Sequence, residues 1–548
     1  MVYINAIKWK LSGLITFLLM MATIIHAVPA KRGVWRLLKL KDGTFVKAEL
    51  RGDEFFHYWQ TADGTYIMDE GSGYAKVGDV GKWMARQKDQ WTQARAKRAS
   101  RRIQTDNFPS YIGKKRGLLL LVEFNNQKFR SDHDVTFYEN VANKVGFTSE
   151  EGYLGSVHDY FLDQSGGLFD LTFDVVGPIS LSYDYAYYGQ NNKDGNDMRA
   201  GEMVAEAVEK ADNKVNYADY DWDDDGEVDM VMLVYAGIGE HEGGGENRIW
   251  PHEWNLSSND NKGVKKLDDM IIDTYACVNE MSRKKSSGIG SICHEFSHIL
   301  GLADMYDLYE DNYGMGSWTI MDIGVYNDDS FCPAGFTSFE KMSCGWIEPI
   351  VLNNDTIVNK MKPLASGGEA YLLQNEGWQN EYYLLENRQQ IGWDAFLPGR
   401  GLLILHIDYN KMLWYLNAVN SPKVSKHLHC TIFHADNSTV IEETDPYPTQ
   451  NNNKLTAVSE PAATLFNINA DSTLFMNKSI TDITQNGDGT IGFTIGPQQY
   501  EPDKIITPRS TSRSQHSNIY SLDGRMMGKD PLRLKPGVYL IDGKKVVK

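Results

Sequence analysis

Long apolar runs alternate with helix-like segments through the middle of the chain. Residues Gly117–Phe124 are apolar almost throughout, which is typical of a strand buried on both faces. Helix-like segments follow at residues 157–163 and 198–211, and a second apolar run at residues 228–236 predicts another strand. This alternation predicts a mixed sheet flanked by helices, an α+β fold.

Shorter alternating segments lie on both sides of that region. Before it, strand-like pieces are separated by Asp-Gly turns at Asp42 and Asp63, a pattern typical of β-hairpins. After it, residues 350–496 alternate apolar and polar positions between Asn- and Gly-rich turns, which favours a β-sandwich-like unit packed against the preceding domain. A polar linker at residues 497–518 leads to a short terminal unit at residues 519–548.

The first residues have the pattern of a secretory signal peptide. Lysines precede an apolar run at residues 11–25, which is short for a bilayer-spanning helix, and the small residues Ala27 and Ala30 follow it. We expect residues 1–30 to be a signal peptide cut near one of these alanines, with an uncleaved anchor as the alternative. No other stretch is apolar enough to cross a membrane, so we expect a secreted or cell-surface protein.

A basic segment from Arg95 to Arg102 divides the β-hairpin unit from the larger domain. We interpret it as an exposed linker open to trypsin-like cleavage, and the alternative is a solvated helix end. The division predicts a β-rich propeptide at residues 31–104 and a main domain at residues 110–349.

The net charge and the cysteine count argue against a nucleic-acid-binding protein and against a disulfide-rich fold. The 548 residues include 55 basic and 73 acidic side chains, and the net charge of -18 argues against a nucleic-acid partner. The five cysteines are an odd number, so the fold does not depend on a dense disulfide network. Cys293 is adjacent to the histidine motif described next, where a thiolate ligand or nucleophile is conceivable but a buried structural role is commoner.

The strongest motif is His294-Glu295-Phe-Ser-His298. On a helix, His294 and His298 lie one turn apart and project from one face, so both imidazoles can bind one metal ion. Glu295 is then placed beside the open coordination position, where it can act as a general base. This is the HExxH arrangement of a zinc hydrolase, and exposed histidines on an amphipathic helix are the weaker interpretation.

Residues after the motif offer a third zinc ligand. Gly301 lets the chain turn, so that Asp304 can return to the metal, and Met321 is placed to form a methionine turn beneath it. Glu340 is the ligand expected of a thermolysin-like geometry, and Asp307 also lies near in sequence. We favour Asp304, and these two alternatives stay open.

An acidic stretch precedes the second apolar run. Asp221, Asp223, Asp225 and Asp229 surround Gly226 in the manner of the first half of a calcium loop. The twelfth position, where an EF-hand needs glutamate, is Met232. We therefore expect a calcium site that is not an EF-hand, with a turn that binds nothing as the alternative.

Taken in order, the motifs resemble the immune inhibitor A family of secreted zinc metallopeptidases. The resemblance covers about residues 110–495, and its main segments are residues 250–252, 294–307, 314–322, 333–346 and 381–408. It implies a zincin domain, a zymogen with an N-terminal propeptide, a bound calcium, and endopeptidase activity on proteins. It also implies zinc ligation by His294 and His298 and general-base catalysis by Glu295.

We therefore expect a monomeric zinc endopeptidase that acts on protein or peptide substrates. A non-peptidase zinc hydrolase, such as a deacetylase or amidase, and an inactive surface-binding protein are the alternatives. Residues 519–548 resemble the end of a Bacteroidetes type IX sorting domain, or form a small β-hairpin module. Candidate donors to the oxyanion are Tyr306, Tyr309, Tyr326 and His252, whereas we interpret His406, His427, His429 and His434 as structural.

Overall fold

The computed structural model describes most of the chain after the expected signal peptide. The described residues are 26–54, 57–69, 73–78, 111–192, 195–258, 263–308 and 313–498, and the strands at 519–521, 526–528, 538–541 and 544–547. Most of the expected signal peptide, the basic segment and most of the polar linker lie outside them. Among the described residues, the search for a helix long and apolar enough to cross a membrane finds none.

One sheet forms the centre of the main domain, with strand order β1-β10-β13-β9-β7-β8. Strands β7, β8, β9 and β13 run parallel to one another, whereas β10 pairs antiparallel with β13. The strands are β7 (Gly113–Glu123), β8 (Phe169–Ser180), β9 (Val231–Ile238), β10 (His252–Asn255) and β13 (Thr274–Ser282), and β14 (Lys285–Ser286) pairs with β13.

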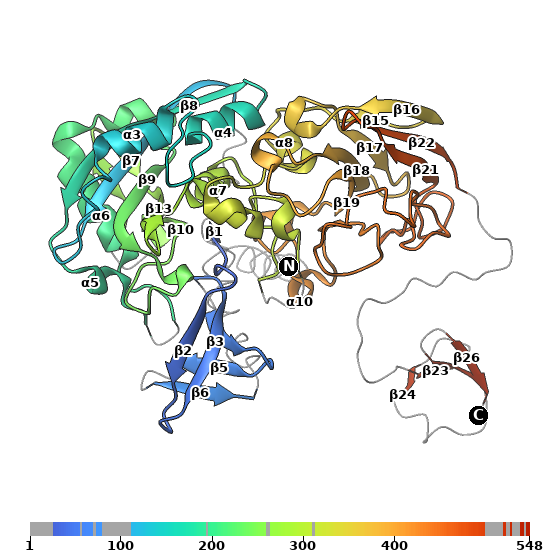
Figure 1. The fold of residues 1–548 in the computed structure, drawn as a ribbon, viewed down its shortest axis with the longest axis horizontal. Coiled ribbons are helices and arrows are strands. Elements are labelled where there is room, and N and C mark those ends of the chain that lie inside the picture. The colour runs from blue at the N-terminus through green and yellow to red at the C-terminus, as the bar shows by residue number, and fades with distance from the viewer. Residues whose placement is uncertain are drawn as a thin grey trace, which may run out of the picture.

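Helices cover both faces of this sheet (Figure 1). Successive leucines of β7 enter different hydrophobic cores: Leu119 and Leu121 contribute to one core, Leu118 and Leu120 to the other. The first core includes helices α3 (Val135–Asn143), α4 (Val157–Gln164) and α7 (Gly290–Ile299), and the second includes α5 (Tyr185–Gly189) and α6 (Ala200–Ala211). Burial on both faces explains the continuous apolar run, and the predicted strands and helices of this region are confirmed.

The N-terminal unit is a five-stranded antiparallel meander of order β2-β3-β4-β5-β6. Its turns use Gly43 and Gly64, whose φ angles of 87° and 83° are strained for other residues. The strands are β2 (Trp35–Lys39), β3 (Phe45–Gly52), β4 (His57–Thr61), β5 (Tyr66–Asp69) and β6 (Tyr74–Val77). The chain before this unit forms β1 (His26–Ala27), which pairs with β10 of the main domain (Figure 1).

Two sheets make up the region after residue 349. One has the order β15-β17-β18-β19-β20 and the other the order β16-β22-β21, and side chains from both share one hydrophobic core. The strands are β15 (Ile350–Val351), β16 (Thr356–Met361), β17 (Tyr371–Gln374), β18 (Glu381–Arg388), β19 (Gly401–Asp408), β20 (Cys430–Ile432), β21 (Lys478–Gln485) and β22 (Ile491–Pro497). Four further strands form a separate sheet near the C-terminus: β23 (Ile519–Ser521), β24 (Met526–Gly528), β25 (Val538–Ile541) and β26 (Lys544–Val547).

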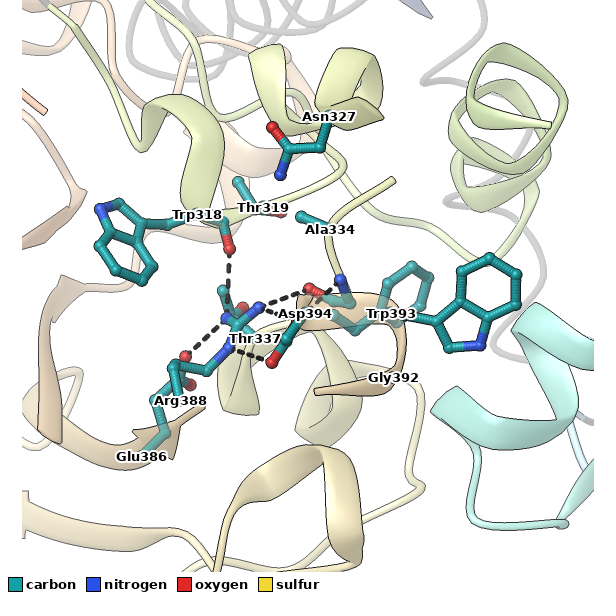
Figure 2. A network of polar contacts seen from close by, with 12 residues as sticks. Trp318, Thr319, Asn327, Ala334, Thr337, Glu386, Arg388, Gly392, Trp393 and Asp394 are labelled. Atoms are coloured by element: carbon teal, nitrogen blue, oxygen red, sulfur yellow. Dashed lines mark hydrogen bonds and ion pairs between the residues drawn. The ribbon is translucent and has the colours of Figure 1, made fainter. Parts of the chain in front are cut away.

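Arg388 joins the β-rich region to the main domain (Figure 2). Its side chain is fully buried, and its guanidinium donates to the carboxylates of Asp394 and Glu386. It also donates to the backbone carbonyls of Trp318 and Gly335 in the main domain, at 3.1 Å each. A buried guanidinium with this many acceptors makes the two regions one structural unit.

Candidate metal centre

Helix α7 places two histidines on one buried face. His294 and His298 are completely buried, and their Nε2 atoms lie 3.2 Å apart. The helix ends at Ile299, and Gly301, with a φ of 82°, turns the chain away from the helix axis. The helical spacing and this turn together bring the following residues back towards the two imidazoles.

The orientation of both imidazoles is set by backbone carbonyls. His294 Nδ1 lies 2.7 Å from the carbonyl oxygen of Ile320, and His298 Nδ1 lies 2.9 Å from that of Leu302. Each Nδ1 therefore carries the proton that donates to its carbonyl, so that each Nε2 presents a lone pair. Two lone pairs facing each other at 3.2 Å are repulsive unless a cation lies between them, which is the arrangement of metal-binding histidines.

Asp304 completes the arrangement. Its Oδ1 lies 3.2 Å from His294 Nε2 and 3.5 Å from His298 Nε2, and within the described chain this buried oxygen accepts no hydrogen bond. Its Oδ2 accepts a hydrogen bond from Asn417 Nδ2 at 2.5 Å. Ligand atoms of a tetrahedral zinc ion, with bonds of about 2.0–2.1 Å, lie about 3.3 Å apart. The two nitrogens and this oxygen fit such an ion, with a fourth position left over.

Glu295 lies beside these three residues and is also completely buried. Its Oε1 accepts a hydrogen bond from the backbone N–H of Val28 at 3.0 Å, while no donor in the described chain reaches Oε2. Burial raises the pKa of Glu295 well above its ordinary value, and the negative charges of Asp304 and Glu253 add to this effect. A carboxyl group with a raised pKa accepts a proton readily, as a general base must.

The N-terminal segment runs across this site. In β1, His26 and Ala27 pair antiparallel with Glu253 and His252 of the edge strand β10. After them, Trp250 Nε1 donates to the carbonyl of Val28 at 2.8 Å. Edge strand, indole and Glu295 thus hold an extended backbone directly beside the two imidazoles.

The same segment makes one more polar contact. The hydroxyl of Tyr326 donates to the carbonyl of Pro29 at 2.5 Å. Burial raises the pKa of Tyr326 well above its ordinary value, so its hydroxyl keeps the proton that it donates. No sequence pattern had indicated this segment as part of the site.

Comparison with known proteins agrees with this geometry. Residues 114–346 match the family model described as "Immune inhibitor A peptidase M6, catalytic domain". Over these residues, which are less than half of the chain, it resembles an immune inhibitor A peptidase M6 catalytic domain. The resemblance inferred from the motifs is therefore confirmed for this part of the chain.

Curated relatives are similar over the same part of the chain. It is 28% identical over 273 residues to "Pre-pro-metalloprotease PrtV" of Vibrio cholerae serotype O1, covering 42% of this chain and 30% of that protein. It is 24% identical over 275 residues to "Immune inhibitor A" of Bacillus thuringiensis subsp. alesti, covering 42% of this chain and 40% of that protein. The chain thus spans less than half the length of the relatives that it matches.

The other candidate ligands near helix α7 lie in surroundings different from those of Asp304. Glu340 lies in α8 (Ser338–Ser343), where its carboxylate accepts hydrogen bonds from Thr337 and Thr319. Asp307 is also buried, and Asp304 is favoured over it because an oxygen of Asp304 lies 3.2 to 3.5 Å from both imidazoles. Cys293 is a buried free thiol, and the five cysteines, all of which are described, form no disulfide.

The four side chains expected as candidate donors to the oxyanion lie in different places. His252 lies on the edge strand, with Nδ1 2.6 Å from the carbonyl of Trp250 and Nε2 3.1 Å from the Tyr275 hydroxyl. Tyr306 is buried, and Tyr309 lies outside the described residues. Tyr326 is the candidate whose hydroxyl contacts the N-terminal segment that runs beside Glu295.

The acidic loop lies before β9. One carboxylate oxygen each of Asp221, Asp223 and Asp225 lies within 4.8 Å of the others. Asp221 accepts from the backbone N–H groups of Asp225 and Gly226, and Asp229 accepts from that of Trp222. Burial raises the pKa of Asp229 to about 7, and the charges of the other three aspartates contribute. The chain thus folds four carboxylates into one loop.

Proposed function

We propose that the protein is a secreted zinc-dependent endopeptidase in which His294, His298 and Asp304 hold the zinc ion. The separations of 3.2 to 3.5 Å between their three ligand atoms carry this proposal. Nitrogen and carboxylate ligands suit zinc, and three protein ligands leave a position for chemistry. When bound, zinc supplies Lewis acidity for a peptide carbonyl and lowers the pKa of water.

Glu295 is the general base of this proposal. Its Oε1 lies beside the backbone N–H of Val28, so the carboxylate faces the path of an extended chain. Here it takes a proton from the attacking water and returns it to the leaving amine. Glu295 binds no metal in this scheme, so its replacement removes the proton transfer and leaves the ligands in place.

Substrate binding follows from the edge strand. The antiparallel pairing of β1 with β10 has the geometry by which an exposed strand edge binds a peptide. A peptide in this register directs a carbonyl at the Tyr326 hydroxyl, as Pro29 does, and Tyr326 is the proposed donor to the oxyanion. An edge that pairs with several residues favours a protein substrate over a small acylated or amidated molecule.

The N-terminal unit acts as a propeptide in this account. Val28 and Pro29 lie where an extended substrate would bind, so the uncut chain is latent. Signal-peptide cleavage near Ala27 would keep both residues, whereas cleavage at Ala30 would remove their contacts with Glu295 and Tyr326. Cleavage at the basic segment of residues 95–102 then releases the unit. Export from the cell agrees with the signal-like sequence at residues 1–30.

Calcium binding at Asp221, Asp223, Asp225 and Asp229 is part of the same proposal. Burial raises the pKa of Asp229, the charges of the other three aspartates add to this effect, and a hard divalent cation with oxygen ligands would offset those charges. The ion would then have a structural role, because it would fix the loop that leads into β9. We further propose a monomer as the active form.

Proteolysis of casein tests the enzymatic proposal. The chain is first cut with trypsin to release the N-terminal unit, and casein cleavage is followed with and without a zinc chelator. We expect cleavage that chelation abolishes and added zinc restores, and none by Glu295→Gln with zinc bound. Cleavage that survives both treatments, or a folded, zinc-loaded and trypsin-cut protein that leaves casein intact, would contradict the proposal.

A further inference from the structure

A second cluster of metal-binding side chains lies in the β-rich region, away from helix α7. Asp408 ends strand β19, and His427 and His429 come just before strand β20. The two histidines are two residues apart, so in an extended chain both project to the same side. One ligand atom from each of the three side chains lies within 4.8 Å of the others.

Nitrogens of both histidines converge on one carboxylate oxygen. His427 Nε2 lies 2.8 Å from Asp408 Oδ2, the distance of a hydrogen bond, and His429 Nδ1 lies 3.6 Å from the same oxygen. Two ligands of one tetrahedral zinc ion are expected to lie about 3.3 Å apart, so small shifts of these side chains would let both nitrogens and the oxygen bind one ion. The imidazole rings are stacked with centroids 3.9 Å apart, so both rings direct a nitrogen at one carboxylate.

Both ring nitrogens of His429 lie close to backbone oxygens. Its Nδ1 lies 2.6 Å from the backbone oxygen of Asp408, and its Nε2 lies 3.2 Å from that of Ser425. A neutral imidazole has one N–H, so the other nitrogen directs a lone pair at an oxygen. A cation bound at Nδ1 removes the conflict, with Nε2–H donating to Ser425.

We propose that Asp408, His427 and His429 bind a second divalent transition-metal ion of the zinc type. Two imidazoles and a carboxylate favour zinc, nickel or copper over calcium and magnesium, which prefer oxygen. The ligands are held from behind: Asn467 Nδ2 donates to Asp408 Oδ1 at 3.1 Å, and Phe466 stacks on His427. The His427 side chain is 26% exposed, which gives an ion access from solvent.

The site closes a loop that reaches the first centre. Between Asp408 and His427, the chain places Asn417 against Asp304 through two hydrogen bonds. The Ser421 hydroxyl accepts from the N–H of Leu308, four residues beyond that aspartate. An ion at the base of this loop would hold it in the position in which Asn417 orients Asp304. This role rests on the proposed function, whereas the ion site itself does not.

Zinc content measures the proposal directly. The full chain is prepared with His294→Ala and His298→Ala, which removes the first centre, then dialysed against zinc and analysed by mass spectrometry of the metal. We expect about one zinc per chain in this background. Adding His427→Gln or Asp408→Asn should remove it. His434→Gln is the matched control, because His434 pairs with Asp445 in the same region and belongs to neither centre.

Melting temperatures of the same proteins distinguish a loss of zinc binding from misfolding of a variant. The double-alanine background and its His434→Gln derivative should gain melting temperature when zinc is added, and the His427→Gln derivative should not. Absence of zinc from the folded double-alanine protein would overturn the proposal, as would zinc that persists at about one per chain in both His427→Gln and Asp408→Asn. If the second ion binds but casein is not cleaved by the parent chain, the proposed function fails and this site stands.

Discussion

Asn417 and Asp304 exchange two hydrogen bonds across 113 residues of sequence. The N–H of Asp304 donates to Asn417 Oδ1 at 2.6 Å, and Asn417 Nδ2 donates to Asp304 Oδ2 at 2.5 Å. The pair fixes the rotation of the carboxylate, so that Oδ1 faces the two histidines. A residue of the β-rich region therefore orients a proposed zinc ligand of the catalytic domain.

Replacement of Asn417 tests this orientation. We expect Asn417→Ala to weaken zinc binding by about 10- to 100-fold, the range typical of residues that orient a metal ligand. The measurement is a competition between the protein and a fluorescent zinc chelator. Asn469→Ala, at a buried asparagine whose amide donates to the carbonyl of Phe475, is the control and should leave zinc affinity unchanged. Equal zinc affinity of Asn417→Ala and the parent would refute an orienting role.

Replacement of Arg388 should greatly lower the free energy of unfolding. Arg388→Ala would leave Glu386 and Asp394 buried without their cation, at a cost of about 3–5 kcal/mol in the free energy of unfolding. Unfolding by denaturant measures this change in the free energy of unfolding. The control is Arg116→Ala at an exposed ion pair, which should cost less than about 1 kcal/mol. Similar losses for both variants would show that the buried network does not join the two regions.

Replacement of Tyr326 should lower kcat. If its hydroxyl donates to the oxyanion, Tyr326→Phe should lower kcat by roughly a hundredfold and change KM little, because the interaction strengthens in the transition state. Peptide hydrolysis by the trypsin-cut chain gives both constants. Tyr220→Phe, at a buried tyrosine whose hydroxyl donates to Asp174, should behave like the parent. A kcat of Tyr326→Phe within twofold of the parent would exclude this role.

The contact of the N-terminal unit with the catalytic domain should depend on pH. Glu246 accepts from the Tyr74 hydroxyl at 2.5 Å. Burial, followed by its hydrogen bond with Asp69, raises its pKa from 4.5 to about 7. The folded state thus favours the protonated form. The stability that this protonated carboxyl contributes is complete below about pH 4.5 and is lost as the pH rises to about 7.

A comparison of melting temperatures checks this sign. The melting temperature of the uncut parent minus that of Glu246→Gln should fall between pH 4.5 and pH 7 and stay level above that range. The neutral amide cannot ionise, so it supplies the reference at each pH. A difference that rises over the same range would mean that Glu246 is ionised in the folded protein.

Much of the local structure can be predicted from residue spacing in the sequence. His294 and His298 share a helix face because four residues make about one turn, and the continuous apolar run of β7 follows from two helical layers. The ligand roles of these histidines and of Asp304 stay predictions. The candidate Glu340 could be set aside only in three dimensions, where Thr337 and Thr319 occupy its carboxylate.

Long-range contacts had no signal in the sequence. The pairing of His26 with Glu253 joins segments more than two hundred residues apart, and β-pairing of this kind leaves no local pattern. Asn417 likewise lies in a loop without a motif. His427 and His429 were interpreted as structural because their spacing matches no common zinc motif, and Asp408 joins them only through the fold of β19 and β20.

Anomalous X-ray diffraction at the zinc absorption edge tests the central claim most directly. Crystals of the full chain carrying Glu295→Gln and grown with zinc should show a peak about 2.0–2.2 Å from His294 Nε2, His298 Nε2 and Asp304 Oδ1. A zinc peak ligated by Glu340 or Asp307 in place of Asp304, or no peak between the two histidines of a zinc-loaded crystal, would contradict it.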